Sequence, residues 1–348
     1  MKILHVTTNY PSERHPAFGV FVQTQLESLA GRKGETDVVC EPFFLDGRGS
    51  VGRYFVAWLR LIGHLLTHRY DILHAHHALS GLLLCLSGAP LFSRTVLSYQ
   101  NSPSREWGRS IFFLLYPFFR RIVLKAADPA YDGFAKVRVI PNGCSQERFK
   151  PMDKAVCRRT LGLDADARYV LFVDANPRRA KRRAGEQKRE DRFDAVLERV
   201  RERLSADSLP LQGTASPVLS LKLREVPPEK MPLYYNAADL YLLTSDFEGS
   251  PNAVKECLLC NTPVVATPVG DLPFLGGRVP GCCVCSGFSE DLLADSVLEV
   301  LAGDAPDDLS PRSSSTPDDL SSRDALLALG YGLDCTASRL LNLYQELL

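Results

Sequence analysis

Two carboxylates, Glu248 and Glu256, stand eight residues apart in the sequence, with a short loop and the start of a helix between them. The loop reads Gly249, Ser250, Pro251 and Asn252. Glycine lets the backbone approach a ligand closely, serine caps a helix or donates a hydrogen bond, and proline suits a first helical turn. The free N–H groups of a helix start bind phosphate, and carboxylates accept hydrogen bonds from vicinal sugar hydroxyls. This combination predicts a site for a nucleotide diphosphate sugar; the alternative is a capping Glu248 and a solvated Glu256.

The residues around the loop predict a strand, helix and strand in succession. Leu240–Leu243 and Val264–Thr267 are short apolar runs of strand length, and Ala253–Cys260 has helical spacing. Strands connected through a helix in this way run parallel. The first carboxylate then lies in the loop, and the second lies about two turns along the helix.

The stretch that contains this unit resembles a known family. Pro227–Asn252, PPEKMPLYYNAADLYLLTSDFEGSPN, and the continuation EGSPNAVKECLLCNTPVVATPVGD are similar to the E-x7-E region of retaining glycosyltransferases of family 4. The resemblance implies an α/β protein with the GT-B fold, in which two Rossmann-like domains face each other across a cleft. It also implies that Glu248 contacts the donor sugar in a catalytic role and that Glu256 contacts the ribose hydroxyls.

A basic segment precedes this unit, at residues 176–192. Members of the resembled family use an arginine and a lysine there to neutralise the leaving diphosphate, as fixed cations can in a site without metal. The donor-binding candidates are Arg178 or Arg179 for the arginine, and Lys181 or Lys188 for the lysine. The alternative is a solvated charged loop.

The first residues predict the start of a Rossmann-like half. Lys2–Thr7 has the pattern of a strand, and Val20–Ala30 has helical spacing after a loop that contains Gly19. The loop lacks the G-x-G-x-x-G pattern, so it does not support a dinucleotide site. By the resemblance, Gly19 faces the acceptor-side cleft; the alternative is an ordinary turn glycine.

Histidines follow the strand predicted over Asp71–His74, in the run His74, Ala75, His76 and His77. Ligands of open parallel sheets bind at the carboxyl ends of the strands, so these side chains lie at a candidate site. A metal centre needs further ligands, and no cysteine or carboxylate nearby in the sequence completes a set. We therefore expect His76 or His77 to line the cleft as a catalytic group that titrates near neutral pH.

The strand predicted over Thr95–Tyr99 ends in Gln100, Asn101, Ser102 and Pro103. Many members of the resembled family carry a histidine-glycine-x-aspartate segment there, with the histidine pointing into the cleft. Gln100 can donate or accept a hydrogen bond on the acceptor side, but it cannot carry a proton at neutral pH. This departure keeps open a catalytically impaired nucleotide-sugar-binding or partner subunit of the same fold. An epimerase or a phosphorylase on this architecture is a further alternative.

Composition limits the class of protein. The 348 residues hold 41 Lys and Arg against 41 Asp and Glu, so no overall field favours nucleic acid. The Asp164-Ala165-Asp166 segment lies in a linker and the ten cysteines lack zinc spacing, so we expect neither metal nor cofactor. Ser110–Asp128 is predicted as one aromatic and basic helix, either a core helix or a peripheral contact with anionic lipid. Without an apolar membrane span or a secretory signal, we expect a cytoplasmic protein, with the inner face of the membrane as an alternative location.

The pattern divides the chain into three parts. Residues 1–150 form an acceptor-side Rossmann-like domain, residues 151–334 a nucleotide-sugar-binding Rossmann-like domain, and residues 335–348 a helix that packs back on the first domain. The resemblance implies a retaining, metal-independent glycosyltransferase of the hexosyltransferase type. Its donor would be a nucleotide diphosphate sugar, and its acceptor a glycan or a lipid-linked sugar, as in polysaccharide biosynthesis.

Overall fold

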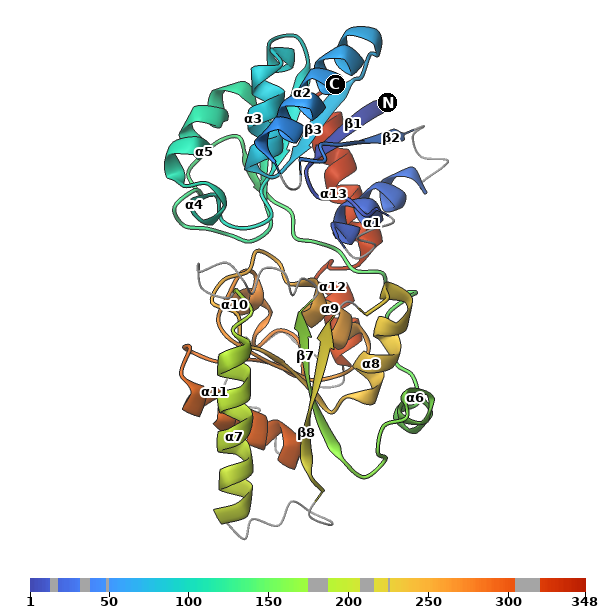
Figure 1. Ribbon diagram of the computed structural model, residues 1–348, viewed down its shortest axis with the longest axis vertical. Coiled ribbons are helices and arrows are strands. Elements are labelled where there is room, and N and C mark those ends of the chain that lie inside the picture. The colour runs from blue at the N-terminus through green and yellow to red at the C-terminus, as the bar shows by residue number, and fades with distance from the viewer. Residues whose placement is uncertain are drawn as a thin grey trace. The chain divides into compact units, whose positions relative to one another are not determined.

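The computed structural model of the chain describes residues 1–12, 18–31, 38–47, 50–174, 187–206, 216–224, 226–303 and 320–348. The chain forms two compact units (Figure 1). Unit 1 comprises Met1–Gly143 together with Leu333–Leu348, and unit 2 comprises Cys144–Gly332. Each unit has a parallel sheet with helices on both faces, which is the Rossmann-like arrangement predicted from the sequence.

Unit 1 is built on a six-stranded sheet in the order β2-β1-β3-β4-β5-β6, and all neighbouring strands pair in parallel. The strands are β1 (Lys2–Thr7), β2 (Val39–Phe44), β3 (Ile72–His76), β4 (Arg94–Ser98), β5 (Arg121–Leu124) and β6 (Val137–Val139). The helices are α1 (Val20–Ala30), α2 (Val51–Thr67), α3 (Ala78–Leu86), α4 (Pro103–Glu106), α5 (Arg109–Leu115) and α13 (Leu333–Gln345), with short 3₁₀ turns η1 (Ala89–Leu91) and η2 (Tyr116–Phe118).

Alternation along these strands produces two apolar layers in unit 1. Leu4 and Leu73 point to the face that packs on α2, α3 and α5, whereas Ile3 and Ile72 point to the face covered by α1 and α13. Figure 1 shows α1 and α13 side by side and apart from α2, α3 and α5. The last helix of the chain therefore belongs to the core of unit 1.

Unit 2 is built on a five-stranded parallel sheet in the order β11-β10-β9-β7-β8. Its strands are β7 (Arg168–Asp174), β8 (Val218–Arg224), β9 (Leu240–Leu243), β10 (Val264–Ala266) and β11 (Cys282–Val284). Its helices are α6 (Lys154–Leu161), α7 (Glu190–Ala206), α8 (Met231–Ala237), α9 (Asn252–Leu259), α10 (Leu272–Leu275), α11 (Glu290–Ala302) and α12 (Ser322–Ala328), with the 3₁₀ turn η4 (Pro228–Lys230).

One face of this sheet packs on α7 and α11, and the other on α8, α9, α10 and α12. The strand, helix and strand predicted around Glu248 are confirmed as β9, α9 and β10, and β9 and β10 are parallel. Glu256 is the fifth residue of α9, so it lies about one turn from the helix start and not two. The loop from β9 to α9 therefore lies at the carboxyl edge of the sheet, where parallel sheets bind ligands.

The prediction of one helix over Ser110–Asp128 is wrong. The segment contains all of α5 except its first residue, then the turn η2 and the whole of strand β5. Pro117 has no N–H to continue a helix, and the β-branched Ile122 and Val123 favour a strand. A second difference matters for the site: β3 continues to His76, two residues beyond the predicted strand.

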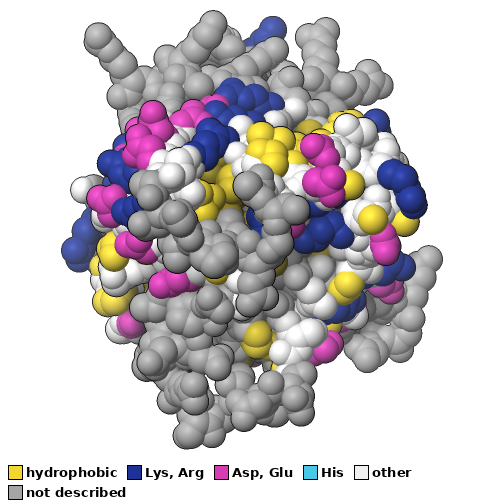
Figure 2. Space-filling model, turned by 90° about the horizontal axis from the view of Figure 1, so that it is seen from below, with side chains coloured by type: hydrophobic (Ala, Val, Ile, Leu, Met, Phe, Trp, Pro, Cys, Tyr) yellow, Lys and Arg dark blue, Asp and Glu magenta, His cyan; other side chains and the backbone are white. Residues whose placement is uncertain are grey.

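Acidic and basic side chains are interspersed on the face of the molecule shown in Figure 2. The same mixture occurs between α7 and α11, where Arg199 pairs with Glu290 at 2.6 Å and Arg203 with Asp291 at 2.9 Å. Within the described ranges, none of the helices combines the length and apolarity that crossing a membrane requires.

Candidate functional site

The loop after β9 holds Glu248 by contacts from three side chains. Its carboxylate accepts hydrogen bonds from Ser245 Oγ at 2.9 Å and from Gln187 Nε2 at 3.1 Å, and it pairs with Lys188 Nζ at 2.7 Å. The side chains of Glu248 and Lys188 are 11% and 28% exposed. Charge-assisted contacts of this length are the stronger kind. They bring one predicted carboxylate and one predicted cation together at the end of β9, and both remain accessible to a ligand.

Close packing between two loops fixes the backbone at Gly249. The N–H of Asp271 donates to Gly249 O at 3.1 Å, and the adjacent Gly270 has a φ of 60°. A Cβ on Gly270 would lie 2.4 Å from Gly249 O, so a residue with a side chain does not fit there. The loop that starts α9 is therefore held against the loop that follows β10.

Ser250 is engaged inside the protein. Its hydroxyl donates to Asp271 Oδ2 at 2.6 Å and receives a short hydrogen bond from the ammonium of Lys255, which also pairs with Asp271 at 3.0 Å. Helix α9 has Pro251 at its N-cap position and no side-chain cap, so neither Ser250 nor Glu248 caps it. Sequence reasoning missed Lys255 and Asp271, whose buried side chains hold Ser250 in place.

The first residue of α9 carries an acceptor that has no protein partner. Asn252 Oδ1 is buried and lacks a hydrogen-bond partner within the part of the chain that the structure describes. Leaving such an acceptor unsatisfied costs about 1–3 kcal/mol. Together with the free N–H groups of a helix start, it indicates a place where a polar ligand or water binds.

Glu256 lies on α9, half-buried, and accepts a hydrogen bond from Tyr235 Oη at 2.6 Å. Burial raises the pKa of Glu256, and the Tyr235 hydroxyl with the nearby cations Arg148 and Lys255 partly offsets that effect. A carboxylate that has lost water is a strong acceptor for hydroxyl donors. Tyr235, supplied by α8, was not anticipated from the sequence.

The other predicted cations cannot be placed. Arg178, Arg179 and Lys181 lie outside the described residues. Lys188 is seven residues beyond Lys181 and pairs with Glu248. Of the four predicted cations, Lys188 is thus the one that the structure describes, and it lies beside the predicted carboxylate.

In unit 1, two of the predicted histidines are enclosed within the sheet. His74 and His76 lie on β3 and His5 lies on β1, all with 0% exposure, and their ring nitrogens come within 4.8 Å of one another. Burial lowers the pKa of His5 to about 3 and those of His74 and His76 well below their ordinary value. At neutral pH these three side chains are therefore uncharged.

Hydrogen bonds already occupy much of this histidine cluster. His74 uses both ring nitrogens, Nδ1 with Tyr344 Oη at 2.5 Å and Nε2 with Ser98 Oγ at 2.7 Å, and His5 Nδ1 lies 3.0 Å from His76 Nε2. A metal ion would have to displace one of the two partners of His74. The arrangement fits a buried network of neutral imidazoles better than a metal centre. All ten cysteines are free thiols.

His77 follows β3 and lies in different surroundings. Its backbone has φ 73° and ψ 154°, a region that residues with a Cβ rarely adopt. The side chain is 18% exposed, with Nδ1 3.6 Å from the Glu106 carboxylate and Nε2 2.6 Å from Asn9 Nδ2. Sequence reasoning missed Asn9 and Glu106, because nothing in their spacing links them to His77.

Gly19 packs on Asn9, and the N–H of Gln100 bonds Glu106. Asn9 and Glu106 both contact the side chain of His77. Gly19 has φ 74° at the start of α1, and a Cβ there would lie 2.4 Å from the Asn9 backbone. Gln100 follows β4, is 9% exposed, and neither atom of its side-chain amide has a hydrogen-bond partner in the described residues. That Gly19 and Gln100 line an acceptor-side cleft stays a prediction.

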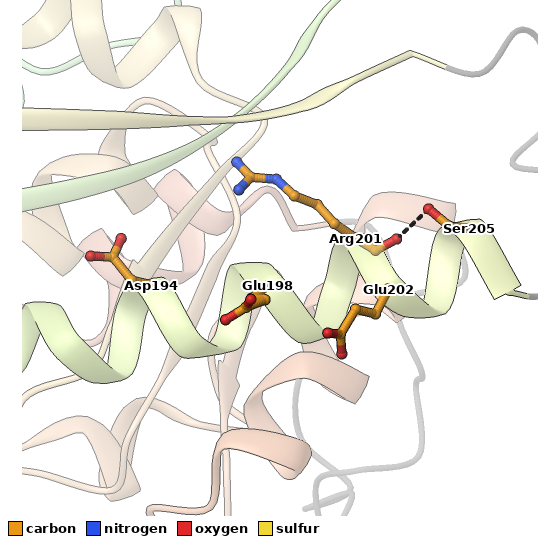
Figure 3. Close-up of a pocket in the computed structure, with 5 residues that line it drawn as sticks. All are labelled: Asp194, Glu198, Arg201, Glu202 and Ser205. Atoms are coloured by element: carbon orange, nitrogen blue, oxygen red, sulfur yellow. Dashed lines mark hydrogen bonds between the residues drawn. The ribbon is translucent and has the colours of Figure 1, made fainter.

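A surface hollow on α7 lies elsewhere in unit 2. It is lined by one helix only, through Asp194, Glu198, Arg201, Glu202 and Ser205 (Figure 3). Ser205 Oγ bonds the backbone of Arg201 at 2.9 Å, and Arg201 Nε bonds Val218 O at 3.0 Å. The five side chains in Figure 3 do not converge on a common point, so this hollow does not resemble a built site.

Known proteins resemble the chain over most of its length. Residues 194–303 match the family described as Glycosyl transferases group 1. A D-inositol 3-phosphate glycosyltransferase of Actinosynnema mirum is 32% identical over 345 residues, which cover 84% of this chain and 76% of the relative. The putative teichuronic acid biosynthesis glycosyltransferase TuaC of Bacillus subtilis (strain 168) is 25% identical over 330 residues, or 80% of this chain and 84% of the relative.

Solved structures share the fold at lower identity. Sucrose-phosphate synthase from Thermosynechococcus elongatus superposes with a TM-score of 0.69 at 17% identity, covering 100% of this chain and 99% of that one. HepE from Anabaena, solved in complex with UDP-glucose, gives a TM-score of 0.64 at 14% identity and covers 99% of this chain and 100% of that one. The predicted GT-B arrangement of two Rossmann-like domains is thereby confirmed as the fold class.

Proposed function

The chain belongs to the group 1 glycosyl transferases, and from that membership we propose that it transfers a sugar from a nucleotide diphosphate sugar to a glycan or lipid-linked acceptor. The observation that carries the proposal is the loop from β9 to α9 in unit 2. There Glu248 is paired with Lys188, Glu256 is half-buried on α9, and Asn252 keeps a buried acceptor without a protein partner in the described chain. Accessible carboxylates beside a helix start suit the hydroxyls and phosphates of such a donor.

Within this proposal the groups of unit 2 divide the donor between them. Glu256 accepts the ribose hydroxyls and Glu248 the hydroxyls of the transferred sugar. The N–H groups at the start of α9 and the ammonium of Lys188 stabilise the diphosphate as its charge increases. Arg178, Arg179 and Lys181 remain candidates for the same task. The resemblance supports this division, and the solved HepE complex contains UDP-glucose.

The reaction itself is proposed to retain the configuration of the sugar and to need no metal ion. The bond between the anomeric carbon and the diphosphate breaks with its electrons on the phosphate oxygen, and the acceptor oxygen forms the new bond. The acceptor hydroxyl gives up its proton in the same step, to a base on the acceptor side. Because fixed cations stabilise the diphosphate, a divalent ion is not required by this scheme.

On the acceptor side we assign His77 rather than His76. The two were equal candidates in the sequence, but His76 is fully buried with a strongly lowered pKa, whereas the side chain of His77 is 18% exposed. A group that exchanges a proton with a substrate must reach it. Gly19 and Gln100 are proposed to shape the same region.

A peripheral membrane contact is proposed for the segments around α5. Large apolar side chains are exposed at Leu91 (71%), Phe92 (89%) and Leu114 (53%), and Arg109 and Arg120 are exposed near them in sequence. Apolar and basic side chains together bind anionic lipid surfaces. We expect Leu91→Ser combined with Phe92→Ser to reduce co-sedimentation with vesicles containing anionic lipid. Equal sedimentation of wild type and variant would argue against the contact.

The experiment that tests the function is incubation with a panel of UDP-, GDP- and ADP-sugars, with release of nucleotide as the readout. Release from one donor supports a transferase. The alternative is a binding or partner subunit, favoured by the absence of the histidine-glycine-x-aspartate segment at Gln100–Pro103. Binding of a donor by calorimetry without release, in the presence of any tested acceptor, would support that alternative instead.

A further inference from the structure

His77 has a strained backbone, in a conformation that glycine would adopt without steric cost. With φ 73° and ψ 154°, His77 adopts a conformation that is nearly confined to glycine. Its N–H bonds Ser98 O at 2.8 Å and its carbonyl accepts from Gly81 N at 3.1 Å. The surrounding structure thus holds the residue in this conformation, and strain of this kind is a reason to ask what the side chain does.

A buried carboxylate lies on one side of the His77 ring. Glu106, the last residue of α4, has a side chain that is 7% exposed. Its Oε1 accepts from the backbone N–H groups of Gln100 at 2.5 Å and Asn101 at 3.0 Å, and its Oε2 accepts from that of Ala78 at 2.9 Å. Three backbone donors hold this carboxylate in one position, and Oε1 lies 3.6 Å from His77 Nδ1.

The charge of Glu106 is maintained despite its burial. Burial raises the pKa of the Glu106 carboxyl. His77 and the N–H groups of Ala78 and Asn101 lower this pKa by more than burial raises it, so the net shift is downward. An ionised carboxylate at this distance favours the imidazolium form of its neighbour. Glu106 can therefore stabilise the charge that His77 acquires when it accepts a proton.

The other ring nitrogen of His77, Nε2, faces an uncharged side chain. His77 Nε2 lies 2.6 Å from Asn9 Nδ2, and the ring is in edge contact with Phe21, with centroids 6.1 Å apart. Gln100, whose N–H binds Glu106, keeps its own buried amide without a hydrogen-bond partner among the described residues. Nε2 therefore contacts the neutral amide of Asn9, whereas Nδ1 lies beside the carboxylate of Glu106.

We propose that Glu106 is the positioning residue for His77, holding Nδ1 beside its carboxylate so that Nε2 is directed to the acceptor hydroxyl in place of the Asn9 amide. This inference rests on the proposed function. In the step, the proton of the acceptor hydroxyl moves to Nε2 as the acceptor oxygen bonds the anomeric carbon, and the electrons of the broken bond stay on the diphosphate. The carboxylate keeps its charge throughout and forms an ion pair with the imidazolium.

The test is an NMR titration of the His77 ring in the full-length protein, with the signal assigned from His77→Ala. In Glu106→Gln the pH midpoint of the ring should fall by about one unit or more, because a charge partner is lost. Glu346→Gln is the matched control: Glu346 pairs with Arg121 at the surface of the same unit, and its loss should leave the midpoint unchanged. An unchanged midpoint in Glu106→Gln overturns the proposal.

Kinetics with UDP-glucose as the probe separate positioning from folding. Glu106→Gln should lower kcat for nucleotide release about ten- to a hundred-fold with the donor KM kept, and shift the acidic limb of the pH profile downward. A lower kcat without a shift in the acidic limb of the pH profile contradicts the proposal. If the Gln variant does not fold, Glu106→Asp is used instead. We expect a smaller downward shift of the His77 midpoint and of the acidic limb, and the absence of any shift would overturn the inference. A wild type that releases nucleotide from none of the UDP-, GDP- and ADP-sugars of the panel refutes the proposed function, while the NMR titration still decides the role of Glu106.

Discussion

In unit 2 the candidate carboxylate Glu248 is paired with a cation and stays 11% exposed, whereas in unit 1 the candidate histidine His76 is fully enclosed. The first has an ion-pair partner in Lys188 at 2.7 Å, whereas burial lowers the pKa of the second well below its ordinary value. Both residues were selected from the sequence by the same kind of argument, a polar group at the carboxyl end of a strand. The comparison teaches that position at a strand end does not by itself give a side chain access to a ligand or a charge partner, and we use these two properties to choose between candidates.

The same comparison separates neighbours within unit 1. His76 is the last residue of β3 and lies four residues after Ile72. Because side chains alternate along a strand, both point to the face covered by α1 and α13. His77 is one residue further and leaves the sheet through a strained backbone, next to Glu106 and Asn9. It therefore has the two properties that Glu248 has in unit 2: a charge partner and partial exposure.

The largest effect is expected for His77→Ala. Loss of a general base should slow turnover by about a hundred- to ten-thousand-fold with donor affinity kept. Single-turnover nucleotide release measures it, and His76→Ala is the comparison, because a buried neutral ring should affect stability more than chemistry. Equal rates for wild type and His77→Ala would remove this histidine from the reaction.

The next largest effect concerns the buried pair under the donor loop. Lys255 is 0% and Asp271 5% exposed, so Lys255→Met leaves an uncompensated buried carboxylate. We expect a loss of about 3–5 kcal/mol in the free energy of unfolding, measured by urea denaturation. The control is Lys222→Met, which breaks partly exposed pairs with Glu190 and Asp194 and should cost about 0–1 kcal/mol. Similar losses for the two variants would contradict the account.

A smaller effect is expected from relieving the strain at His77. Both His77→Gly and His77→Ala remove the ring, but only glycine adopts φ 73° without steric cost. The Gly variant should therefore be more stable than the Ala variant by about 1–3 kcal/mol in thermal or urea unfolding. A Gly variant less stable than the Ala variant would show that the backbone is not strained.

No effect is expected from chelation. With Lys188 and the start of α9 available to stabilise the diphosphate, activity should survive EDTA. The Asp164-Ala165-Asp166 segment offers little support for a metal, since Asp164 accepts a hydrogen bond from Asp166 N–H within its own turn at 3.0 Å. Loss of activity on chelation, with recovery on adding Mn²⁺ or Mg²⁺, would overturn the metal-free scheme.

Local patterns allowed much of unit 2 to be predicted. The apolar run Leu240–Leu243 and the proline before α9 mark the strand and the helix start, so Glu248 and Glu256 could be placed from spacing alone. The contact between Glu106 and His77 could not, since 29 residues separate them and the fold of unit 1 brings them together. Likewise, Lys255 looks like a solvated helix residue in the sequence, and only the loop carrying Asp271 explains its burial.

The helix predicted over Ser110–Asp128 failed for a related reason. Its aromatic and basic composition fits an amphipathic helix, but Pro117 interrupts it and Ile122 and Val123 pair with neighbouring strands. The composition of this segment nevertheless led to the proposed lipid contact. Its apolar side chains Phe113 and Leu114 are exposed, as that proposal requires.

The central claim, that unit 2 binds a nucleotide diphosphate sugar through the carboxylates beside α9, is tested most directly by calorimetry with UDP-, GDP- and ADP-sugars on wild type, Glu256→Ala and Glu256→Gln. With the donor that wild type binds, Glu256→Ala should weaken affinity by about 1–3 kcal/mol, because the ribose hydroxyls lose a charged acceptor. Glu256→Gln should also weaken donor binding. It should not lower the free energy of unfolding, because burial raises the pKa of the Glu256 carboxyl. Above the pKa of a free glutamate, the charged form of such a group destabilises the folded state, and the neutral amide removes that charge. A donor bound by both variants with wild-type affinity would contradict the account.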